Sequence, residues 1–307
     1  MNLVRSQELA LSVCICAHNR SDNLARCLEA LKGQCRDIQL IIVDSASGDI
    51  HEAEIRNLAS LHRANLIRLN QPGLSAARNA ALSATTTSWI AYLDDDTIPS
   101  EQWVDAAIRV ISEVPSDCSI IGGRIVPLFP PDGTSSIGPR WLQLLSVVDM
   151  NGEGDQTDRP HIVGANVLFR VQTIRQAGGF PLSLGRSGTS LLSGEEKFIV
   201  EHLRSNGQRI WYSETLSVQH HIAPQRLLRS WVIRRSYWEG ASDRRIDALL
   251  GRRPSIGRFL KILFAVPILA LLYPIGGHRE FFIRFWYNVG WLASGKSSLL
   301  GKDRQLG

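Results

Sequence analysis

Hydrophobic and polar positions alternate regularly over the first part of the chain. Five short runs are apolar and rich in β-branched residues, which is typical of buried strands: 11–17, 38–44, 65–69, 88–94 and 118–126. Four intervening segments repeat apolar residues at helical spacing: 21–33, 51–63, 74–84 and 100–114. This strand–helix alternation predicts an α/β fold, with a Rossmann-like, mostly parallel sheet covered by helices on both faces.

The alternation continues to residue 222 after an interruption. Residues 127–160 are rich in Pro and Gly and predict a long loop region, with one short helix around 141–148. Beyond it the pattern predicts a strand at 161–170, a helix at 194–207 and a strand at 208–213. We therefore expect one catalytic domain over residues 1–222.

The pattern changes over residues 223–307, for which we expect a helical extension. Residues 225–253 are Arg-rich and have a helical pattern, and 262–275 form an apolar run that contains Pro267 and Pro274. As a helix, this run would extend roughly 21 Å at about 1.5 Å per residue. Because a bilayer core is about 30 Å thick, the run is short for a single crossing.

The charge distribution sharpens this division. Residues 222–307 hold 15 Lys and Arg against 5 Asp and Glu, whereas the whole chain holds 34 against 29. A mildly acidic body thus carries a strongly basic tail, in which arginines and aromatic residues flank the apolar run. This combination predicts attachment to the cytoplasmic face of a membrane, as a peripheral or re-entrant hairpin. The alternative is a helical pair packed on the domain's own core.

Two further features bear on the location of the protein. The five cysteines show no CxxC or paired Cys/His spacing, which favours free thiols over zinc or disulfides. The N-terminal apolar run is short and is interrupted by Arg5 and Glu8, so it does not resemble a signal peptide. Both features favour a cytoplasmic catalytic part.

Candidate chemistry gathers where the predicted strands end. Asp94, Asp95 and Asp96 directly follow an apolar run, and Asp44 ends another. Adjacent carboxylates repel one another, and a hard divalent cation such as Mn²⁺ or Mg²⁺ would relieve that repulsion. Alternation along an extended segment would place Asp94 and Asp96 on one side and Asp95 on the other. The alternative is a solvated acidic turn.

Five motifs in this order resemble family 2 glycosyltransferases of the GT-A fold: "SVCICAHNR", "IIVDSASGD", "NQPGLSAARNAAL", "IAYLDDDTIP" and "GEEKFIVEHL". The similarity covers roughly residues 10–222. It implies a nucleotide-diphospho-sugar donor, with uridine expected as the nucleoside, a Mn²⁺ or Mg²⁺ cofactor and a single displacement with inversion.

The resemblance also implies which residues bind the donor. Those expected to face the base, ribose and diphosphate are Ala17, His18, Asn19, Arg20, Asp44, Gly73, Arg78 and Asn79. Asp94 would lie near the ribose and the metal, Asp95 near the sugar, and Asp96 would hold the metal. His220 is a further candidate metal ligand, with His221 as its alternative. Gly164, Ala165 and Asn166 would approach the donor sugar.

The catalytic base in such enzymes comes from a Glu-Asp pair that opens a late helix. Here the pair reads Glu195-Glu196, and by position Glu196 takes the role of the base, with Glu195 as the substitute. The expected acceptor is a hydroxyl of a glycan or of a lipid-linked intermediate. The alternative for both glutamates is stabilisation of the helix N-terminus.

Two other functions remain open at this point. A nucleotidyltransferase shares the layered sheet and the metal carboxylates, but it usually has a Gly-rich basic segment after the first strand, and "AHNRSDN" contains no glycine. A non-catalytic membrane-attached scaffold would fit the basic tail. We expect no nucleic acid partner, because the carboxylates of the body would repel a polyanion.

Overall fold

The α/β prediction is confirmed in the computed structural model, which describes residues 11–34, 38–131, 133, 137–186, 191–272 and 279–300. One mixed sheet has the strand order β3-β2-β1-β4-β8-β6-β9-β5, with β7 paired to β9. The first four strands are parallel to one another, and β8 runs antiparallel to both β4 and β6. The predictions for residues 1–10, Cys35 and the end of the apolar run at 273–275 lie outside the described residues.

The strands and helices of the body follow the predicted order. The strands are β1 (Leu11–Ala17), β2 (Gln39–Ser45), β3 (Asn65–Leu69), β4 (Trp89–Asp94), β5 (Thr97–Pro99), β6 (Cys118–Leu128), β7 (Glu153–Asp155), β8 (Asn166–Arg170) and β9 (Arg209–His221). The helices are α1 (Ser21–Ala30), α2 (Asp49–Leu61), α3 (Leu74–Ala84), α4 (Trp103–Glu113), α5 (Pro139–Leu144), α6 (Val171–Gln176) and α7 (Glu195–Ser205).

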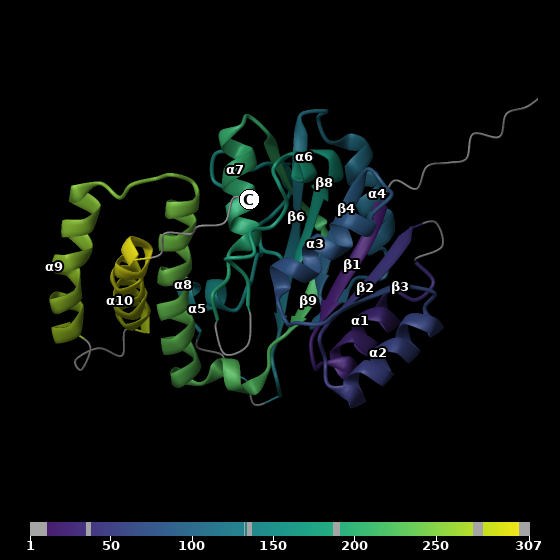
Figure 1. Ribbon diagram of the computed structural model, residues 1–307, viewed down its shortest axis with the longest axis horizontal. Coiled ribbons are helices and arrows are strands. Elements are labelled where there is room, and N and C mark those ends of the chain that lie inside the picture. The colour runs from purple at the N-terminus through teal and green to yellow at the C-terminus, as the bar shows by residue number, and fades with distance from the viewer. Residues whose placement is uncertain are drawn as a thin grey trace, which may run out of the picture.

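Helices cover both faces of the sheet, as expected (Figure 1). Side chains of α1, α2 and α4 share one buried apolar cluster with one face of the strands. Side chains of α3, α6 and α7 share a second cluster with the other face. Neighbouring residues of β1 divide between the two, with Val13 in the first and Cys14 in the second, as the alternation of side chains along a strand requires.

Several boundaries differ from the prediction. β9 continues to His221 instead of ending at 213, because its outer half pairs with β5 and β6. The loop region at 127–160 contains α5 and the short β7, and the strand expected at 161–170 begins only at Asn166. The described cysteines are unpaired thiols, which agrees with the prediction.

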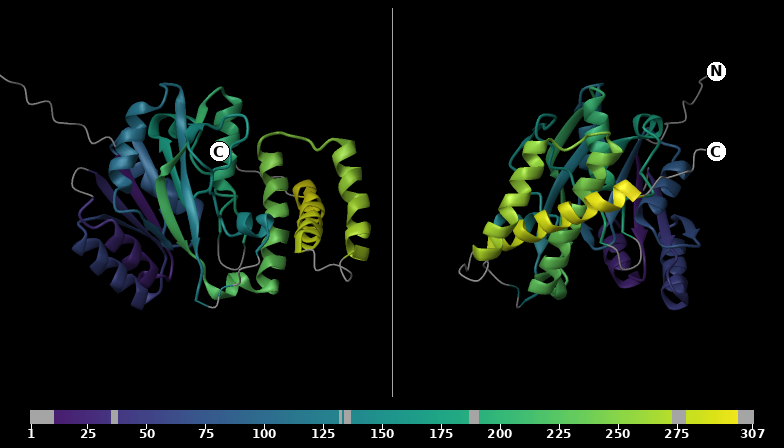
Figure 2. Two further views of the ribbon diagram at one scale, coloured as in Figure 1. Left: turned by 180° about the vertical axis from the view of Figure 1, so that it is seen from behind. Right: turned by 60° about the vertical axis from the view of Figure 1, so that its left-hand side comes forward.

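The C-terminal helices form a layer beside the sheet (Figure 2). They are α8 (Arg229–Leu249), α9 (Ile256–Leu272) and α10 (Arg279–Leu300), preceded by a short 3₁₀ helix at Pro224–Leu227. Phe282 and Ile283 of α10 and Val232 of α8 share a third apolar cluster with Trp141 of α5. The layer therefore packs partly on the body.

This packing buries two of the aromatic residues that follow the apolar run. Phe282 is 8% exposed and Trp291 only 1%, because α10 packs against α8. The largest group of exposed large apolar side chains on one described element lies on α9: Ile256, Phe259, Leu260, Leu263, Phe264 and Ile268. Among the described residues, no helix combines the length and the apolar character that a membrane crossing requires.

Candidate active site

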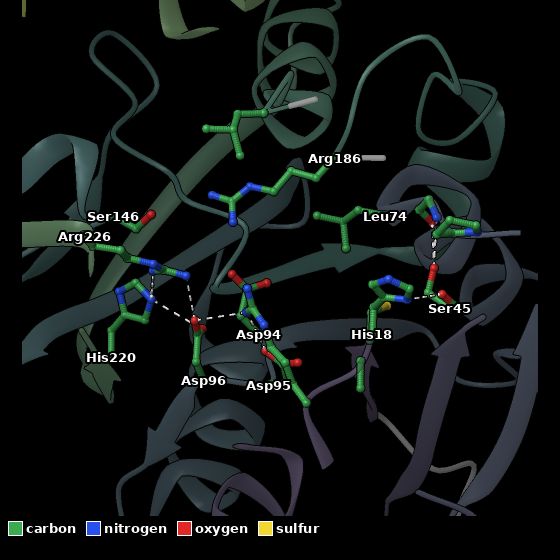
Figure 3. Close-up of a pocket in the computed structure, with 16 residues that line it drawn as sticks. His18, Ser45, Leu74, Asp94, Asp95, Asp96, Ser146, Arg186, His220 and Arg226 are labelled. Carbon is green, nitrogen blue, oxygen red and sulfur yellow. Dashed lines mark hydrogen bonds and ion pairs between the residues drawn. The ribbon is translucent and has the colours of Figure 1, made fainter. Parts of the chain in front are cut away.

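The carboxyl ends of β1, β2 and β4 meet at one edge of the sheet and open into a cavity of about 260 Å³ (Figure 3). His18 follows β1, Ser45 ends β2 and Asp94 ends β4, and all three line this cavity. The register explains this, since Cys16 of β1 lies beside Asp94 and Ala17 lies beside Asp44. Ligands of open parallel sheets bind at such an edge.

The three aspartates do not alternate as predicted. The chain turns after Asp94, and Asp95 and Asp96 both become buried while Asp94 stays partly exposed. Arg20 Nη1 lies 3.3 Å from Asp95 Oδ1 and 3.5 Å from Asp96 Oδ2. The predicted alternation, with Asp95 on the opposite side, is therefore wrong, because Asp95 and Asp96 lie in a turn and not in an extended strand, and all three aspartates line the cavity.

Positive groups compensate Asp96. Its Oδ2 accepts a hydrogen bond of 2.9 Å from Arg226 Nη2, and its Oδ1 lies 3.3 Å from His220 Nε2. Burial acts to raise the pKa of Asp96, but His220, Arg226 and Arg20 together hold it below its ordinary value. Burial and the charge of Asp96 raise the pKa of Asp95 to about 8. Asp96 is therefore the ionised member of this buried pair at neutral pH.

His220 is held in a defined orientation. Its Nδ1 lies 2.9 Å from the carbonyl oxygen of Leu145, so Nδ1 carries a proton and donates it there. Nε2 then lies 3.0 Å from Arg226 Nη1 and 3.3 Å from Asp96 Oδ1. A neutral imidazole accepts there from Arg226, whereas a protonated imidazole donates to Asp96. Nε2 points toward Asp96 and lines the cavity, whereas His221 donates its backbone N–H to the Asp96 carbonyl. The structure thus favours His220 over His221 as a cavity residue.

Arg78 contacts both Asp94 and the predicted base, Glu196. Its Nη2 lies 3.4 Å from Asp94 Oδ1 and donates to the carbonyl oxygen of Gly164 at 3.2 Å. Its Nη1 donates to Glu195 Oε1 at 2.8 Å and lies 3.6 Å from Glu196 Oε2. A Cβ on Gly164 would lie 2.4 Å from Arg78 Nη2, so a larger residue there would force the guanidinium to move. One buried guanidinium therefore places Glu196 next to the cavity residue Asp94.

Glu195 and Glu196 differ in exposure. Glu195 is 1% exposed and its Oε2 has no hydrogen-bond partner among the described residues, whereas Glu196 is partly exposed. Burial, followed by the charge of Glu196, raises the pKa of Glu195 to about 7. Both begin α7 after Gly194, which has a φ of +92°. Neither glutamate lines the cavity itself, and Glu196 is the one that solvent reaches.

Four predicted residues form hydrogen bonds inside the protein and do not line the cavity. Asp44 is 1% exposed, accepts from the backbone N–H of Ser47 and pairs with Arg68. Asn19 bonds to the backbone of Gly48, Asn79 to that of Phe180, and Asn166 to the carbonyl oxygens of Arg124 and Leu216. Asp44 and Asn166 are buried, and all four side chains make hydrogen bonds at strand or helix ends or in the adjoining loops. Ala17, His18, Arg20 and Gly73 do line the cavity.

Sequence reasoning missed several cavity residues, and the two charged ones matter most. Arg186 lies in the segment after α6, and Arg226 lies in the 3₁₀ helix after β9. Other residues that line the cavity and were not named from the sequence include Ser45, Leu74, Ser146 and Leu191. The basic character of the tail was a signal for Arg226, but its contact with Asp96 spans 130 positions of sequence.

The carboxylate oxygens of this site suit a divalent cation, on the condition that one contact with an arginine is broken. Asp94 and Asp96 offer hard oxygens on one cavity, and Mg²⁺ or Mn²⁺ commonly needs only one or two carboxylates beside water and phosphate. The condition is that Arg226 releases Asp96 Oδ2, which it occupies at 2.9 Å. No group of three or more metal-binding side chains is preassembled in the described part of the chain.

Comparison with known proteins gives consistent results. Residues 12–175 match the family model described as glycosyl transferase family 2. A pre-mycofactocin glycosyltransferase of Mycobacterium tuberculosis is 27% identical over 76% of this chain and 46% of its own length. A glucosyl-dolichyl phosphate glucuronosyltransferase of Haloferax volcanii is 24% identical over 58% of this chain and 56% of its own length. The chain thus spans about half the length of these relatives.

One solved structure extends the likeness to nearly the whole chain. It is the mannosyltransferase PcManGT of Pyrobaculum calidifontis in complex with GDP-Man and Mn²⁺, with a TM-score of 0.58 and 16% identity. The match covers 97% of this chain and 82% of that one. At this identity the likeness concerns the fold, which is the GT-A fold.

Proposed function

The chain belongs to glycosyl transferase family 2, and on this basis we propose that it transfers a sugar from a nucleotide-diphospho-sugar to a hydroxyl of a glycan or lipid-linked acceptor. The observation that supports this most is the arrangement around Arg78. That guanidinium lies 3.4 Å from Asp94 on the cavity wall and 3.6 Å from Glu196 at the start of α7. A donor-binding carboxylate and a candidate base are thus held by one side chain.

Nucleotide binding is assigned to the edge formed by β1 and β2. Ala17, His18, Ser45 and Gly73 provide a wall of small and polar groups, and His18 Nδ1 is fixed 2.7 Å from the carbonyl oxygen of Ser45. We retain uridine as the proposed nucleoside. Ser45 replaces Asp44 as the residue of β2 that faces this ligand, because Asp44 is bound to Arg68 and Ser47.

Transfer is proposed as a single displacement with inversion. Glu196 accepts the proton of the acceptor hydroxyl while that oxygen forms its bond to the anomeric carbon and the nucleoside diphosphate departs. Arg78 holds Glu196 in place, with Arg78 Nη1 3.6 Å from Glu196 Oε2. A Mn²⁺ or Mg²⁺ ion bound by Asp94 and Asp96, with His220 as a further ligand, would neutralise the charge of the departing diphosphate.

Metal-dependent binding of the donor tests this proposal. UDP-, GDP- and dTDP-sugars are titrated into the full chain with Mn²⁺ and then with EDTA. One of them should bind only with the metal, and Asp96→Asn should weaken that binding by at least about tenfold, since the site loses one of its anionic ligands. Asp105→Asn is the control, because Asp105 is an exposed residue of α4 that does not line the cavity. Metal-independent binding of every donor, or unchanged binding by Asp96→Asn, would refute the metal assignment.

The same protein preparation distinguishes the proposed glycosyltransferase from the alternative enzyme class, a nucleotidyltransferase. A nucleotidyltransferase would release pyrophosphate from a sugar phosphate and a nucleoside triphosphate. A glycosyltransferase releases nucleoside diphosphate when an acceptor is added. Pyrophosphate release as the main activity would replace the proposed function.

We also propose that α9 attaches the protein to an anionic membrane surface, on the cytoplasmic side. Phe264 is 66% exposed and Ile268 is 57% exposed, and the neighbouring exposed residues Arg258 and Lys261 are basic. An exposed apolar face beside positive charge is typical of a helix that lies in the headgroup region. The acceptor would then be reached at the same surface, which agrees with a lipid-linked substrate.

Sedimentation with vesicles tests the attachment. The chain should sediment with phosphatidylglycerol vesicles more than with phosphatidylcholine vesicles, and Phe264→Ser should reduce this by several fold. Leu182→Ser is the matched control, because Leu182 is an equally exposed apolar residue, at 73%, on the body. Equal sedimentation of Phe264→Ser and the unchanged chain would refute the role of α9.

A further inference from the structure

Arg186 belongs to the segment between α6 and α7, and it lines the candidate active-site cavity. Its backbone is fixed at the beginning of α3, where the Arg186 carbonyl oxygen accepts from Leu74 N at 3.2 Å. Gly185 allows this close approach, because it has a φ of +90° and a Cβ there would lie 2.6 Å from Ser75 Oγ. The side chain of Arg186 therefore starts from a defined position beside Leu74, which is itself a cavity residue.

From this position the side chain of Arg186 extends into the cavity. Figure 3 shows it leaving the side of Leu74 and passing above Asp94 in that view, with the guanidinium directed toward Arg226. Asp94 and Arg226 line the same cavity. The guanidinium is thus carried away from the wall proposed for the nucleoside and toward the side of the cavity where the aspartates lie.

Arg186 differs from the other two arginines of the cavity in having no anionic partner. Arg20 Nη1 lies 3.3 Å from Asp95 Oδ1, and Arg226 Nη2 donates to Asp96 Oδ2 at 2.9 Å. No hydrogen bond or ion pair of the Arg186 guanidinium occurs among the described residues. Guanidinium nitrogens that are withdrawn from water normally have acceptors, and this side chain is partly buried. An anion that enters the cavity would supply the missing partner.

The electrostatic surroundings of Arg186 agree with this. Burial, followed by the charges of Arg235 and Arg226, lowers the pKa of Arg186 from its ordinary value. The aspartates thus do not compensate this guanidinium as they compensate Arg20 and Arg226. A negatively charged ligand would reduce the unfavourable energy of holding a third positive charge in one cavity.

We propose that Arg186 binds a phosphate group of the ligand that occupies this cavity, and that this is the phosphate of the nucleotide donor to which the sugar is attached. The proposal rests on the proposed function for the identity of the donor. A guanidinium can donate two parallel hydrogen bonds to phosphate oxygens and keeps its charge at every ordinary pH. During transfer, the bond between the anomeric carbon and this phosphate breaks, its electron pair stays on the phosphate oxygen, and Arg186 stabilises the added negative charge.

The position of Arg186 favours the donor over the acceptor as the source of the phosphate. Its backbone lies beside the proposed nucleoside wall, and its side chain extends toward the aspartates proposed to hold the metal. The diphosphate of a donor joins the nucleoside to the sugar, so it has to cross between these two parts of the cavity. The acceptor hydroxyl, in contrast, is expected near Glu196, which does not line this cavity.

Titration of UDP and UMP into the full chain with Mn²⁺ tests the assignment, with GDP and GMP in their place if guanosine is the nucleoside that binds. Arg186→Gln should weaken diphosphate binding by about tenfold, the effect of losing one charge-assisted contact, and monophosphate binding by no more than about twofold. Arg186→Lys keeps the charge and should recover part of the diphosphate affinity. Arg234→Gln, an exposed arginine of α8 that does not line the cavity, is the control.

Stability without ligand separates this role from a structural one. The guanidinium has no partner to lose among the described residues, so Arg186→Gln should unfold at the same urea concentration as the unchanged chain or at a higher one. A variant that is less stable without ligand, and that binds UDP like the unchanged chain, would make Arg186 a structural residue and overturn the proposal.

Three binding results would also overturn it. The first is unchanged affinity of Arg186→Gln for the diphosphate. The second is equal loss of affinity for the diphosphate and the monophosphate, which would move Arg186 away from the phosphate that carries the sugar. The third is binding of geranyl phosphate in the presence of saturating UDP that Arg186→Gln abolishes, which would assign Arg186 to the acceptor.

Inorganic pyrophosphate keeps the test independent of the proposed function. If no nucleotide binds the unchanged chain, the proposed function fails, and pyrophosphate with Mn²⁺ takes the place of the nucleotides. Binding of pyrophosphate that Arg186→Gln weakens by about tenfold would still support Arg186 as the residue that binds a phosphate in this cavity. Pyrophosphate binding that Arg186→Gln leaves unchanged would contradict it.

Discussion

The α/β body and the C-terminal helical layer are built in opposite ways. The body has two apolar clusters of its own, one on each face of the sheet, and presents acidic side chains at the strand ends. The layer formed by α8, α9 and α10 shares its apolar cluster with α5 and carries most of the basic residues that follow residue 222. Both faces of the sheet are thus covered by helices of the body, whereas the layer and α5 bury one another.

At the candidate active site, the body in turn depends on contacts with the C-terminal helices and with the segment that leads to them. Arg226, between the two regions, compensates Asp96, and α8 supports the helix that bears the predicted base. Lys197 of α7 pairs with Asp243 of α8 at 2.6 Å, and a Cβ on Gly194 would lie 2.8 Å from Ile246 Cδ1. The comparison teaches that acidic chemistry comes from the body, while positive charge and support come from the layer.

The largest expected effect concerns the predicted catalytic base, Glu196, which belongs to the body. Glu196→Gln should lower the rate of transfer by a factor of about 10² to 10⁴, the usual contribution of a positioned base, and should leave donor affinity within about twofold. Single-turnover assays and donor titration measure the two quantities. Glu113→Gln, an exposed glutamate of α4, should behave like the unchanged chain.

Two results would count against this division of roles. Normal turnover by Glu196→Gln would assign the proton to another group. Loss of donor affinity in the same variant would mean that Glu196 binds the donor and does not act as the base.

A smaller effect is expected when the layer itself is separated. A Cβ on Gly290 of α10 would lie 1.9 Å from the Tyr237 carbonyl oxygen of α8, so Gly290→Ala forces the two helices apart. Such overpacking typically costs about 1–3 kcal/mol. Urea denaturation of full-length protein measures it.

Gly257→Ala on α9 is the matched control for this substitution. A Cβ at Gly257 meets nothing within 4 Å, so the change should be neutral or slightly stabilising through helix propensity. Equal stability of Gly290→Ala and Gly257→Ala would show that α8 and α10 are not packed as described.

The last expected effect depends on pH and concerns Glu195, which pairs with Arg78. The pKa of Glu195 is raised from 4.5 to about 7, so the folded state holds its proton between these values while the unfolded state releases it. Stability from this group is full below about pH 4.5 and is lost as pH rises through about 7, with a slope of at most about 1.4 kcal/mol per pH unit.

Glu195→Gln should remove this slope. The free energy of unfolding of the variant, minus that of the unchanged chain, should therefore rise between pH 5 and pH 7 in urea titrations. Glu29→Gln, a glutamate of α1 that is 65% exposed, should show no such trend. A difference that does not change with pH would mean that Glu195 is ionised throughout.

The sequence predicted the parts of the site that follow from local periodicity. Apolar runs located the strands, and the polar residues that follow them, such as His18 and Asp94, lie on the cavity because parallel strands end at one edge. Asp44, Asn79 and Asn166, chosen in the same way, do not line the cavity, since a polar residue at a strand or helix end can equally well bond to nearby backbone. Residue type alone does not separate these two uses.

Residues from distant segments could not be predicted in the same way. Arg186 and Arg226 reach the cavity from a loop and from the segment after β9, and no repeating pattern connects them with Asp96. The aromatic residues of α10 were expected at a membrane surface, but Trp291 packs against α8, with Arg244 stacked 4.6 Å from its ring centroid. Whether such aromatic residues lie at the surface or in a core depends on how the helices pack on the body.

The most direct test of the central claim is a crystal structure of the full chain with the nucleoside diphosphate and Mn²⁺, in which anomalous scattering locates the metal. The account predicts a manganese peak in contact with the carboxylates of Asp94 and Asp96, Arg226 withdrawn from Asp96, and the nucleoside beside His18 and Ser45. A manganese peak away from these aspartates, or a nucleotide bound outside the cavity, would contradict it.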